Sequence, residues 1–141
     1  PSARAGPAPR ARLPRALWLV IAAAAFTQAS HAALYAFGSI HWKGMGLSSA
    51  TIGYLWAVGV VAEILLFAVL GRHVGRGAPG LPLLFLGAGS AVLRFLGLAA
   101  DPGLASIVAL QVLHGLSFGA THLGSMAAFA SLAPPAGRGR A

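Results

Sequence analysis

The 141-residue chain contains only two acidic residues, and one of them, Glu63, lies in the apolar run VVAEILLF at positions 60–67. A charged side chain at the centre of a bilayer costs about 2.5–3.5 kcal/mol on insertion scales, so such residues usually have a function or a partner. A carboxylate in this setting can carry a proton, bind a solute or pair with a cation. Glu63 is therefore the first candidate for a functional residue.

Arg94 is a second charged residue inside an apolar run, in LRFLG at positions 93–97. Adjacent antiparallel helices would bring Glu63 and Arg94 to comparable depths, which predicts electrostatic coupling between them. The pair either holds helices together as a buried ion pair or acts directly on a solute or a proton. The sequence leaves both alternatives open.

Two other apolar runs carry polar stripes at helical spacing. Polar residues on all four runs predict that these faces meet in a shared interior or a water-filled cavity rather than in lipid. The first stripe consists of Thr27, Gln28, His31, Tyr35 and Gly38, and the second of Gln111, His114, Thr121, His122 and Ser125.

Eight polar residues are the candidate pathway for a solute and for protons. The histidines of the fourth run are candidate proton partners of Glu63, because histidine titrates near physiological pH. Interhelical hydrogen bonding is the simpler interpretation of Gln28, Ser117 and Ser125, and close helix packing that of Gly115 and Gly119. The eight are Glu63, Arg94, His114, His122, His31, Gln28, Tyr35 and Gln111.

Enzyme and metal chemistry find little support in these residues. His114 and His122 lie two helical turns apart, but no acidic or thiolate ligand lies near them in the sequence. We therefore predict no metal site and no cofactor. No nucleophile–base pair, phosphate loop or dinucleotide fingerprint occurs, so an enzyme is not expected.

Composition indicates that lipid surrounds these residues. Hydrophobic residues make up 57% of the chain and charged residues 9%, against roughly 25% charged in soluble domains. Mean hydropathy is +0.79, and a soluble protein of this length could not cover so much apolar surface. The net charge of +8 also suits nucleic acid, but the basic residues lie mainly between apolar runs without interleaved aromatics. We therefore expect a lipid bilayer as partner and no nucleic acid.

The predicted fold is an all-α membrane protein with four transmembrane helices, because each of four apolar runs reaches about 20 residues. They cover residues 17–40, 50–70, 81–100 and 104–132. The domain division is a loop rich in Pro, Ala and Arg at 1–16, the four-span portion at 17–133 and a tail at 134–141.

The connections between spans are short. Residues 41–49 are predicted to form an interfacial turn broken by Gly44 and Gly46, with Ser48 or Ser49 capping the next helix. Asp101 is predicted to be a turn residue and helix cap. The simple interpretation of His41 and His73 places both in loops without a special role.

Basic residues alternate between connections in a way that predicts orientation. Four arginines precede the first span, two lie in the 71–80 loop and two in the tail, whereas the alternate connections hold one lysine, Lys43, and none. Positively charged loops remain in the cytoplasm. We therefore expect a multi-pass protein of the inner (plasma) membrane with both termini cytoplasmic.

Four segments of the chain carry a resemblance to a known family: SHAALYAFGSIHW (30–42), SSATIGYLWAVGVVAE (48–63), LRF (93–95) and LQVLHGLSFGATHLGSM (110–126). Together they resemble the C-terminal half of major facilitator superfamily transporters, in the phenylpropionic acid permease-like group related to the lactose and nucleoside proton symporters. The resemblance implies that the spans are helices seven to ten of a twelve-helix bundle. GRHVGRGAP at 71–79 resembles the second copy of the superfamily's Gly- and Arg-rich loop, without its acidic residue.

The resemblance also implies roles for individual residues. Sugar–proton symporters of the superfamily distribute a carboxylate, an arginine and a histidine over helices eight, nine and ten. Glu63, Arg94 and His114 (or His122) lie on the corresponding spans here, but the second carboxylate on helix ten is missing.

The expected function is therefore that of a fragment of a secondary active transporter, which imports a small organic solute with protons by alternating access. Candidate solutes are an aromatic acid, a sugar or a nucleoside, and the required partner is the missing transporter half. The alternative is a small four-helix membrane protein with a structural or assembly role and no transport activity.

Overall fold

The computed structural model describes residues 14–74 and 79–132, and every regular element in these ranges is helical. Four helices are long and apolar enough to cross a membrane, which confirms the all-α membrane fold. They are α1 (Arg15–Gly44), α2 (Ser49–Val74), α3 (Gly80–Ala99) and a fourth span made of α4 (Leu104–His114), η1 (Gly115–Ala120) and α5 (Thr121–Leu132).

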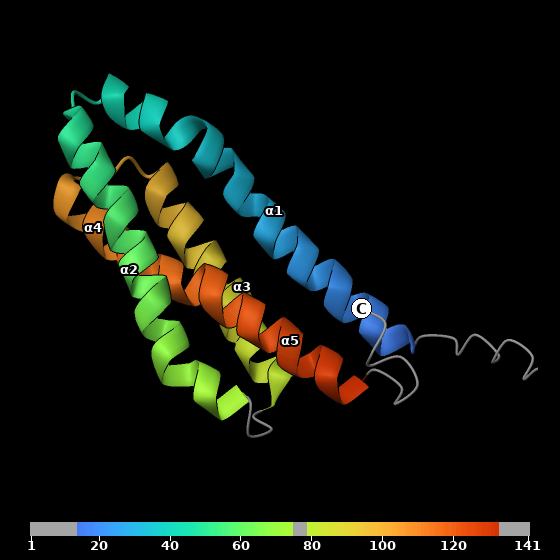
Figure 1. Cartoon of the computed structure of the whole chain (residues 1–141). Coiled ribbons are helices and arrows are strands. Elements are labelled where there is room, and N and C mark those ends of the chain that lie inside the picture. Colours follow the sequence, from blue (N-terminus) through green and yellow to red (C-terminus); the bar gives the residue numbers. More distant parts are fainter. Residues whose placement is uncertain (1–13, 75–78, 133–141) are drawn as a thin grey trace, which may run out of the picture.

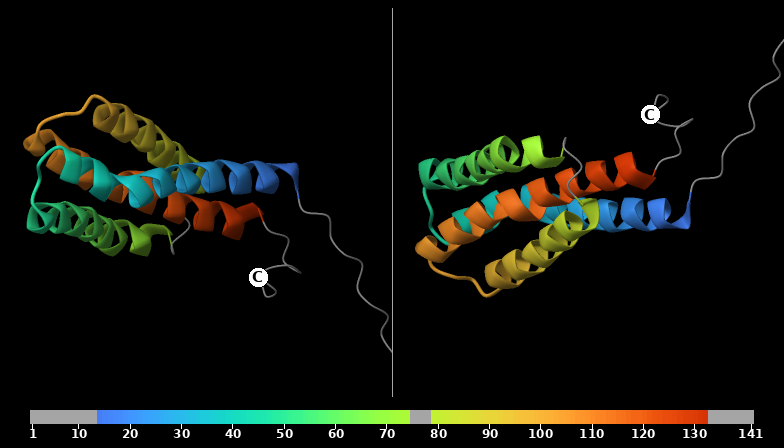
Figure 2. Two further views of the ribbon diagram at one scale, coloured as in Figure 1. Left: turned by 90° about the horizontal axis from the view of Figure 1, so that it is seen from above. Right: turned by 90° about the horizontal axis from the view of Figure 1, so that it is seen from below.

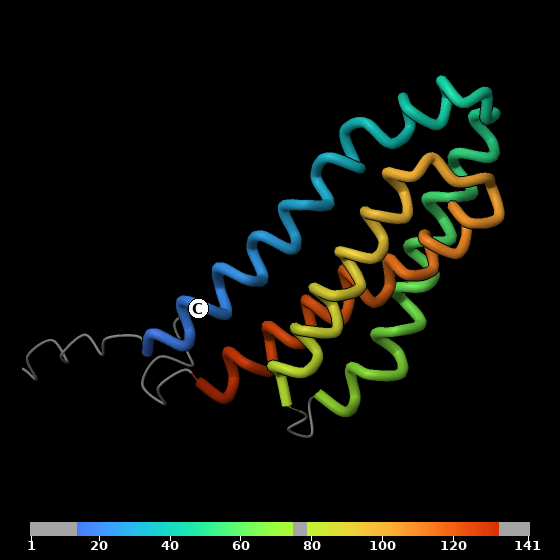
Figure 3. The backbone as a smooth tube through the Cα atoms, turned by 180° about the vertical axis from the view of Figure 1, so that it is seen from behind, coloured from blue at the N-terminus to red at the C-terminus, as the bar shows by residue number. Residues whose placement is uncertain are grey.

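The helices run antiparallel between two ends of the bundle (Figure 3). The α1–α2 and α3–α4 turns lie at one end, while the start of α1 and the end of α5 lie at the other. The fourth span is the most buried of the four, and it contacts α1, α2 and α3. Figures 1 and 2 show α2 and α3 on opposite sides of it.

Helix α1 is longer than predicted, since residues 41–44 are helical and not part of the turn. The Leu47 amide bonds the Trp42 carbonyl at 3.1 Å and the Gly46 amide bonds the Lys43 carbonyl at 3.0 Å. This is the Schellman pattern, which places a left-handed residue after the helix, and Gly46 has φ of +87°. Ser48 caps α2 as predicted, its Oγ accepting from the Thr51 amide at 3.1 Å.

Glycines allow the fourth span to pack closely against α2 and α3. A Cβ at Gly115 would lie 2.7 Å from the Ala62 carbonyl oxygen, and one at Gly119 would lie 3.0 Å from Leu66 Cδ2. These contacts confirm the predicted close packing of Gly115 and Gly119. On the α3 side, a Cβ at Gly124 would lie 2.5 Å from the Leu84 amide nitrogen.

The π-helix η1 interrupts the fourth span, which sequence periodicity predicted as one regular helix. An extra residue in a turn shifts the helical phase by about 100°. Four of the five residues predicted to form the second polar stripe are nevertheless buried, namely Gln111, His114, Thr121 and Ser125. The fifth, His122, is exposed.

Two apolar clusters occupy opposite ends of the bundle. One contains Trp42, Leu55 and Ile107, and the other contains Val20 and Leu84. Between these ends, near the middle of the helices, the buried side chains are mainly polar. The fold therefore positions a polar layer between two apolar layers.

Candidate functional site

His31 of α1 contacts the fourth span at the centre of the polar layer. It is fully buried, and its Nδ1 lies 2.9 Å from the Thr27 carbonyl oxygen, so Nδ1 donates the hydrogen. Its Nε2 lies 3.1 Å from Ser117 Oγ, and a neutral His31 therefore accepts there. The Ser117 hydroxyl has a second acceptor in the His114 carbonyl, 3.3 Å away, to which it turns if His31 becomes doubly protonated.

Glu63 of α2 lies beside His114 of the fourth span. Glu63 Oε2 is 3.7 Å from His114 Nε2, and the Tyr35 hydroxyl approaches the same nitrogen at 3.5 Å. The Glu63 side chain is 20% exposed and that of His114 only 7%, so the carboxylate is at the edge of the layer and the imidazole is inside. The rings of His31 and His114 are 5.4 Å apart between centroids.

Arg94 of α3 is fully buried, and two of its three nitrogens have neutral acceptors. Nε donates to the Leu110 carbonyl at 3.0 Å and Nη2 donates to Gln111 Oε1 at 2.6 Å. Nη1 has no hydrogen-bond partner within residues 14–74 and 79–132. No carboxylate in these ranges lies within ion-pair distance of the guanidinium.

Of the two alternatives for Glu63 and Arg94, a buried ion pair formed by direct contact is therefore wrong. Its premise was that the second and third spans are neighbours, but the fourth span lies between them. The carboxylate consequently contacts His114, and the guanidinium contacts Gln111. Both of those partners belong to the intervening span.

Gln28 and His122 form no hydrogen bond with this cluster among the described residues. Gln28 is half-buried in α1, and its Oε1 has no hydrogen-bond partner in the described part of the chain. His122 is exposed and packs against the Phe67 ring at 5.9 Å between centroids. The structure thus brings six of the eight predicted residues into one polar layer.

The predictions that His41 and His73 lie in loops and that Asp101 caps a helix are wrong. His41 lies in α1 and His73 in α2, not in loops. His41 Nε2 is 2.8 Å from Asp101 Oδ1, which joins α1 to the α3–α4 turn. Asp101 has φ of +47° and is not the cap of α4, because Gly103 occupies that position.

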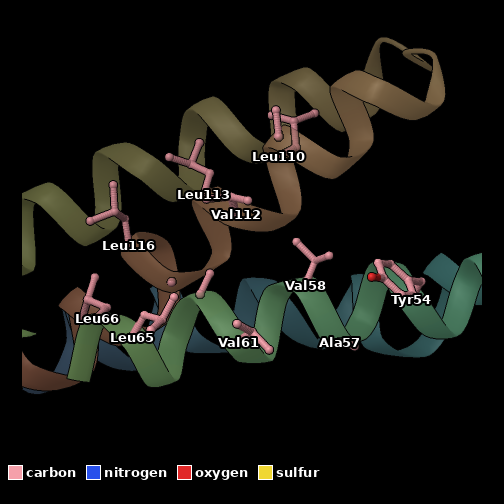
Figure 4. Close-up of a pocket in the computed structure, with 13 residues that line it drawn as sticks. Tyr54, Ala57, Val58, Val61, Leu65, Leu66, Leu110, Val112, Leu113 and Leu116 are labelled. Atoms are coloured by element: carbon pink, nitrogen blue, oxygen red, sulfur yellow. The ribbon is translucent and has the colours of Figure 1, made fainter. Parts of the chain in front are cut away.

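A large apolar groove of about 880 Å³ lies between α2 and the fourth span (Figure 4). The Tyr54 hydroxyl is the only polar side-chain group that lines it, and none of the eight candidate residues reaches it. An apolar groove on a membrane helix bundle suits lipid chains or another helix. The titratable side chains therefore lie in the polar layer and not in this groove.

The polar layer combines titratable side chains with a cation that has no carboxylate partner among the described residues. Carboxylate and imidazole lie close enough to stabilise one another when both are charged. The buried guanidinium holds a positive charge in a region of low dielectric constant, where an anion would be bound strongly. Among the described residues there is no cluster of three or more potential metal ligands.

Comparison with known proteins places this multi-pass helix bundle in a family. The model of the MFS_1 like family matches residues 10–141. The chain belongs to this family, which confirms the resemblance to the major facilitator superfamily. No solved structure matches the chain.

A curated relative is named "Probable 3-phenylpropionic acid transporter", from Escherichia coli (strain K12). It is 35% identical over 114 residues, which cover 81% of this chain and 30% of the relative. The chain therefore spans less than a third of the length of the curated relative it matches.

Proposed function

We propose that the chain is part of a secondary transporter of the inner membrane, which carries a small organic carboxylate into the cell together with protons. Alternating access would be completed by a second transporter half that packs against these helices. Family membership and the name of the curated relative support transport of an aromatic acid. The observation that carries the proposal is the burial of Arg94, which has no carboxylate partner within residues 14–74 and 79–132.

Arg94 is the proposed anchor of the solute's carboxylate. A buried cation without a counter-charge is costly in a membrane protein, and an anionic solute removes that cost when it binds. The guanidinium offers parallel N–H groups that match a carboxylate. Its free Nη1 is one donor for this contact.

Glu63 and His114 are the proposed proton carriers. They lie 3.7 Å apart, and the carboxylate is the more exposed of the two groups. Tyr35 and His31 adjoin His114 and are the proposed continuation of the path, through Ser117. Each proton gained or lost changes the charge beside the solute site, which couples the two movements.

The anchor is tested by comparing 3-phenylpropionate with its neutral amide in an exchange assay without a pH gradient, in the complete protein that contains this chain. Because a lost charge pair costs several kcal/mol, Arg94→Gln is expected to weaken binding of the acid by at least about tenfold. Binding of the amide should not change. Arg72→Gln, at the exposed end of α2, is the control and should behave as wild type. A preference for the acid that survives in Arg94→Gln would place the anchor elsewhere.

Orientation is tested with single cysteines, since the chain itself has none. Gly46, in the α1–α2 turn, and His73, in the last turn of α2, are both exposed. The loop charges predict that a membrane-impermeant thiol reagent labels Gly46→Cys in intact cells and labels His73→Cys only after permeabilisation. The opposite pattern would reverse the proposed topology. The 75–78 segment of the basic loop lies outside the described residues.

A further inference from the structure

We propose that Gln111 is a positioning residue that holds Arg94 ready for the solute and connects the solute site to α2. The inference rests on the proposed role of Arg94 as the carboxylate anchor. Gln111 lies in the fourth span, is 1% exposed and joins three helices through one amide group.

The two ends of the amide have fixed roles. Oε1 accepts from Arg94 Nη2 of α3 at 2.6 Å, and Nε2 donates to the Leu55 carbonyl of α2 at 2.9 Å. A guanidinium only donates and a carbonyl only accepts, so the amide has a single orientation that satisfies both partners. Gln111 therefore determines where the guanidinium lies relative to α2.

A neutral acceptor at this position has a specific consequence. An amide oxygen satisfies one donor of Arg94 but leaves its positive charge uncompensated. A carboxylate here would neutralise the guanidinium permanently and occupy the group that the solute requires. Glutamine thus orients Arg94 without competing with an anionic solute.

The same amide connects solute binding to the helix that carries Glu63. Nη2 carries two N–H groups, so a carboxylate can bind Nη1 and Nη2 while Nη2 still donates to Gln111. A shift of the guanidinium toward the solute would be passed through Gln111 to the Leu55 carbonyl of α2. Leu55 and Glu63 are eight residues apart on α2, about 12 Å along the helix axis, so the shift would reach the helix that carries Glu63.

Two substitutions at Gln111 separate this role from a structural one. Gln111→Glu preserves the shape but places a counter-charge on Arg94, so 3-phenylpropionate binding is expected to fall at least about tenfold and the preference over the amide to disappear. Gln111→Met removes both hydrogen bonds without adding charge. It should weaken binding of the acid while leaving the preference for acid over amide intact.

The control is Ser106→Glu, which adds the same charge at the exposed first turn of α4 and should bind 3-phenylpropionate as wild type does. If Gln111→Glu and Gln111→Met both bind the acid as wild type does while Arg94→Gln does not, Gln111 has no positioning role and the anchor remains. If Arg94→Gln also binds normally, the proposed anchor itself is wrong. If Gln111→Glu does not fold, the affinity of Gln111→Met for 3-phenylpropionate decides whether Gln111 positions Arg94. A wild-type affinity in that variant contradicts the inference.

Discussion

Replacement of Glu63 by glutamine is expected to abolish accumulation of solute against a gradient while solute exchange remains measurable. Glutamine keeps the size of the side chain but neither ionises nor carries a proton. The change also removes the charge that lies 3.7 Å from His114. Exchange needs only binding and the conformational change, whereas accumulation needs the coupled proton.

The measurement is uptake of 3-phenylpropionate by the complete protein in liposomes, with and without an imposed pH gradient, beside an exchange assay. Asp101→Asn is the matched control, because Asp101 is the other acidic residue of the chain and is exposed at the α3–α4 turn. It should accumulate solute normally. If Glu63→Gln concentrates solute with wild-type dependence on external pH, Glu63 has a structural role and is not the proton carrier.

Replacement of Gly87 by valine is expected to remove most of the folded protein. A Cβ at Gly87 would overlap Thr121, including its backbone nitrogen at 2.6 Å, so α3 and α5 would have to separate. Overpacking typically costs about 1–3 kcal/mol when side chains can adjust. Here the backbone itself must move, so the expected loss approaches the entire free energy of unfolding of a marginally stable protein.

Gly89 on the same helix provides the control, because nothing lies within 4 Å of a Cβ placed there. Gly89→Val should therefore yield as much monodisperse protein in detergent as wild type, with an unchanged melting temperature. Equal yields and melting temperatures for the two variants would show that the close approach of α3 and α5 at Gly87 is not present in the protein.

The four spans were predictable from the sequence because each is a long apolar run, and length is the dominant constraint in a bilayer. The order of the four spans around the bundle could not be predicted from the sequence. The prediction of a Glu63–Arg94 pair treated neighbours along the chain as neighbours in space. Glycines at 87, 115 and 124 instead allow the fourth span to approach α3 and α2 and to separate them.

Helical periodicity correctly grouped Gln111 and His114 with Thr121 and Ser125 as buried residues, but His122 is exposed. The π-helix at Gly115–Ala120 lies between His114 and His122, and no feature of a single sequence indicates a π-helix reliably. Ser117 was predicted to form a hydrogen bond between helices, and its contact with His31 of α1 confirms this. The identity of the partner could not be predicted from the sequence.

The most direct test of the account is uptake of 3-phenylpropionate into proteoliposomes that contain the complete protein, driven by an imposed pH gradient alone. The account predicts that solute accumulates above the external concentration when the interior is alkaline, and that a protonophore abolishes the accumulation. Uptake that stops at equal concentrations and does not respond to the gradient would contradict proton-coupled transport.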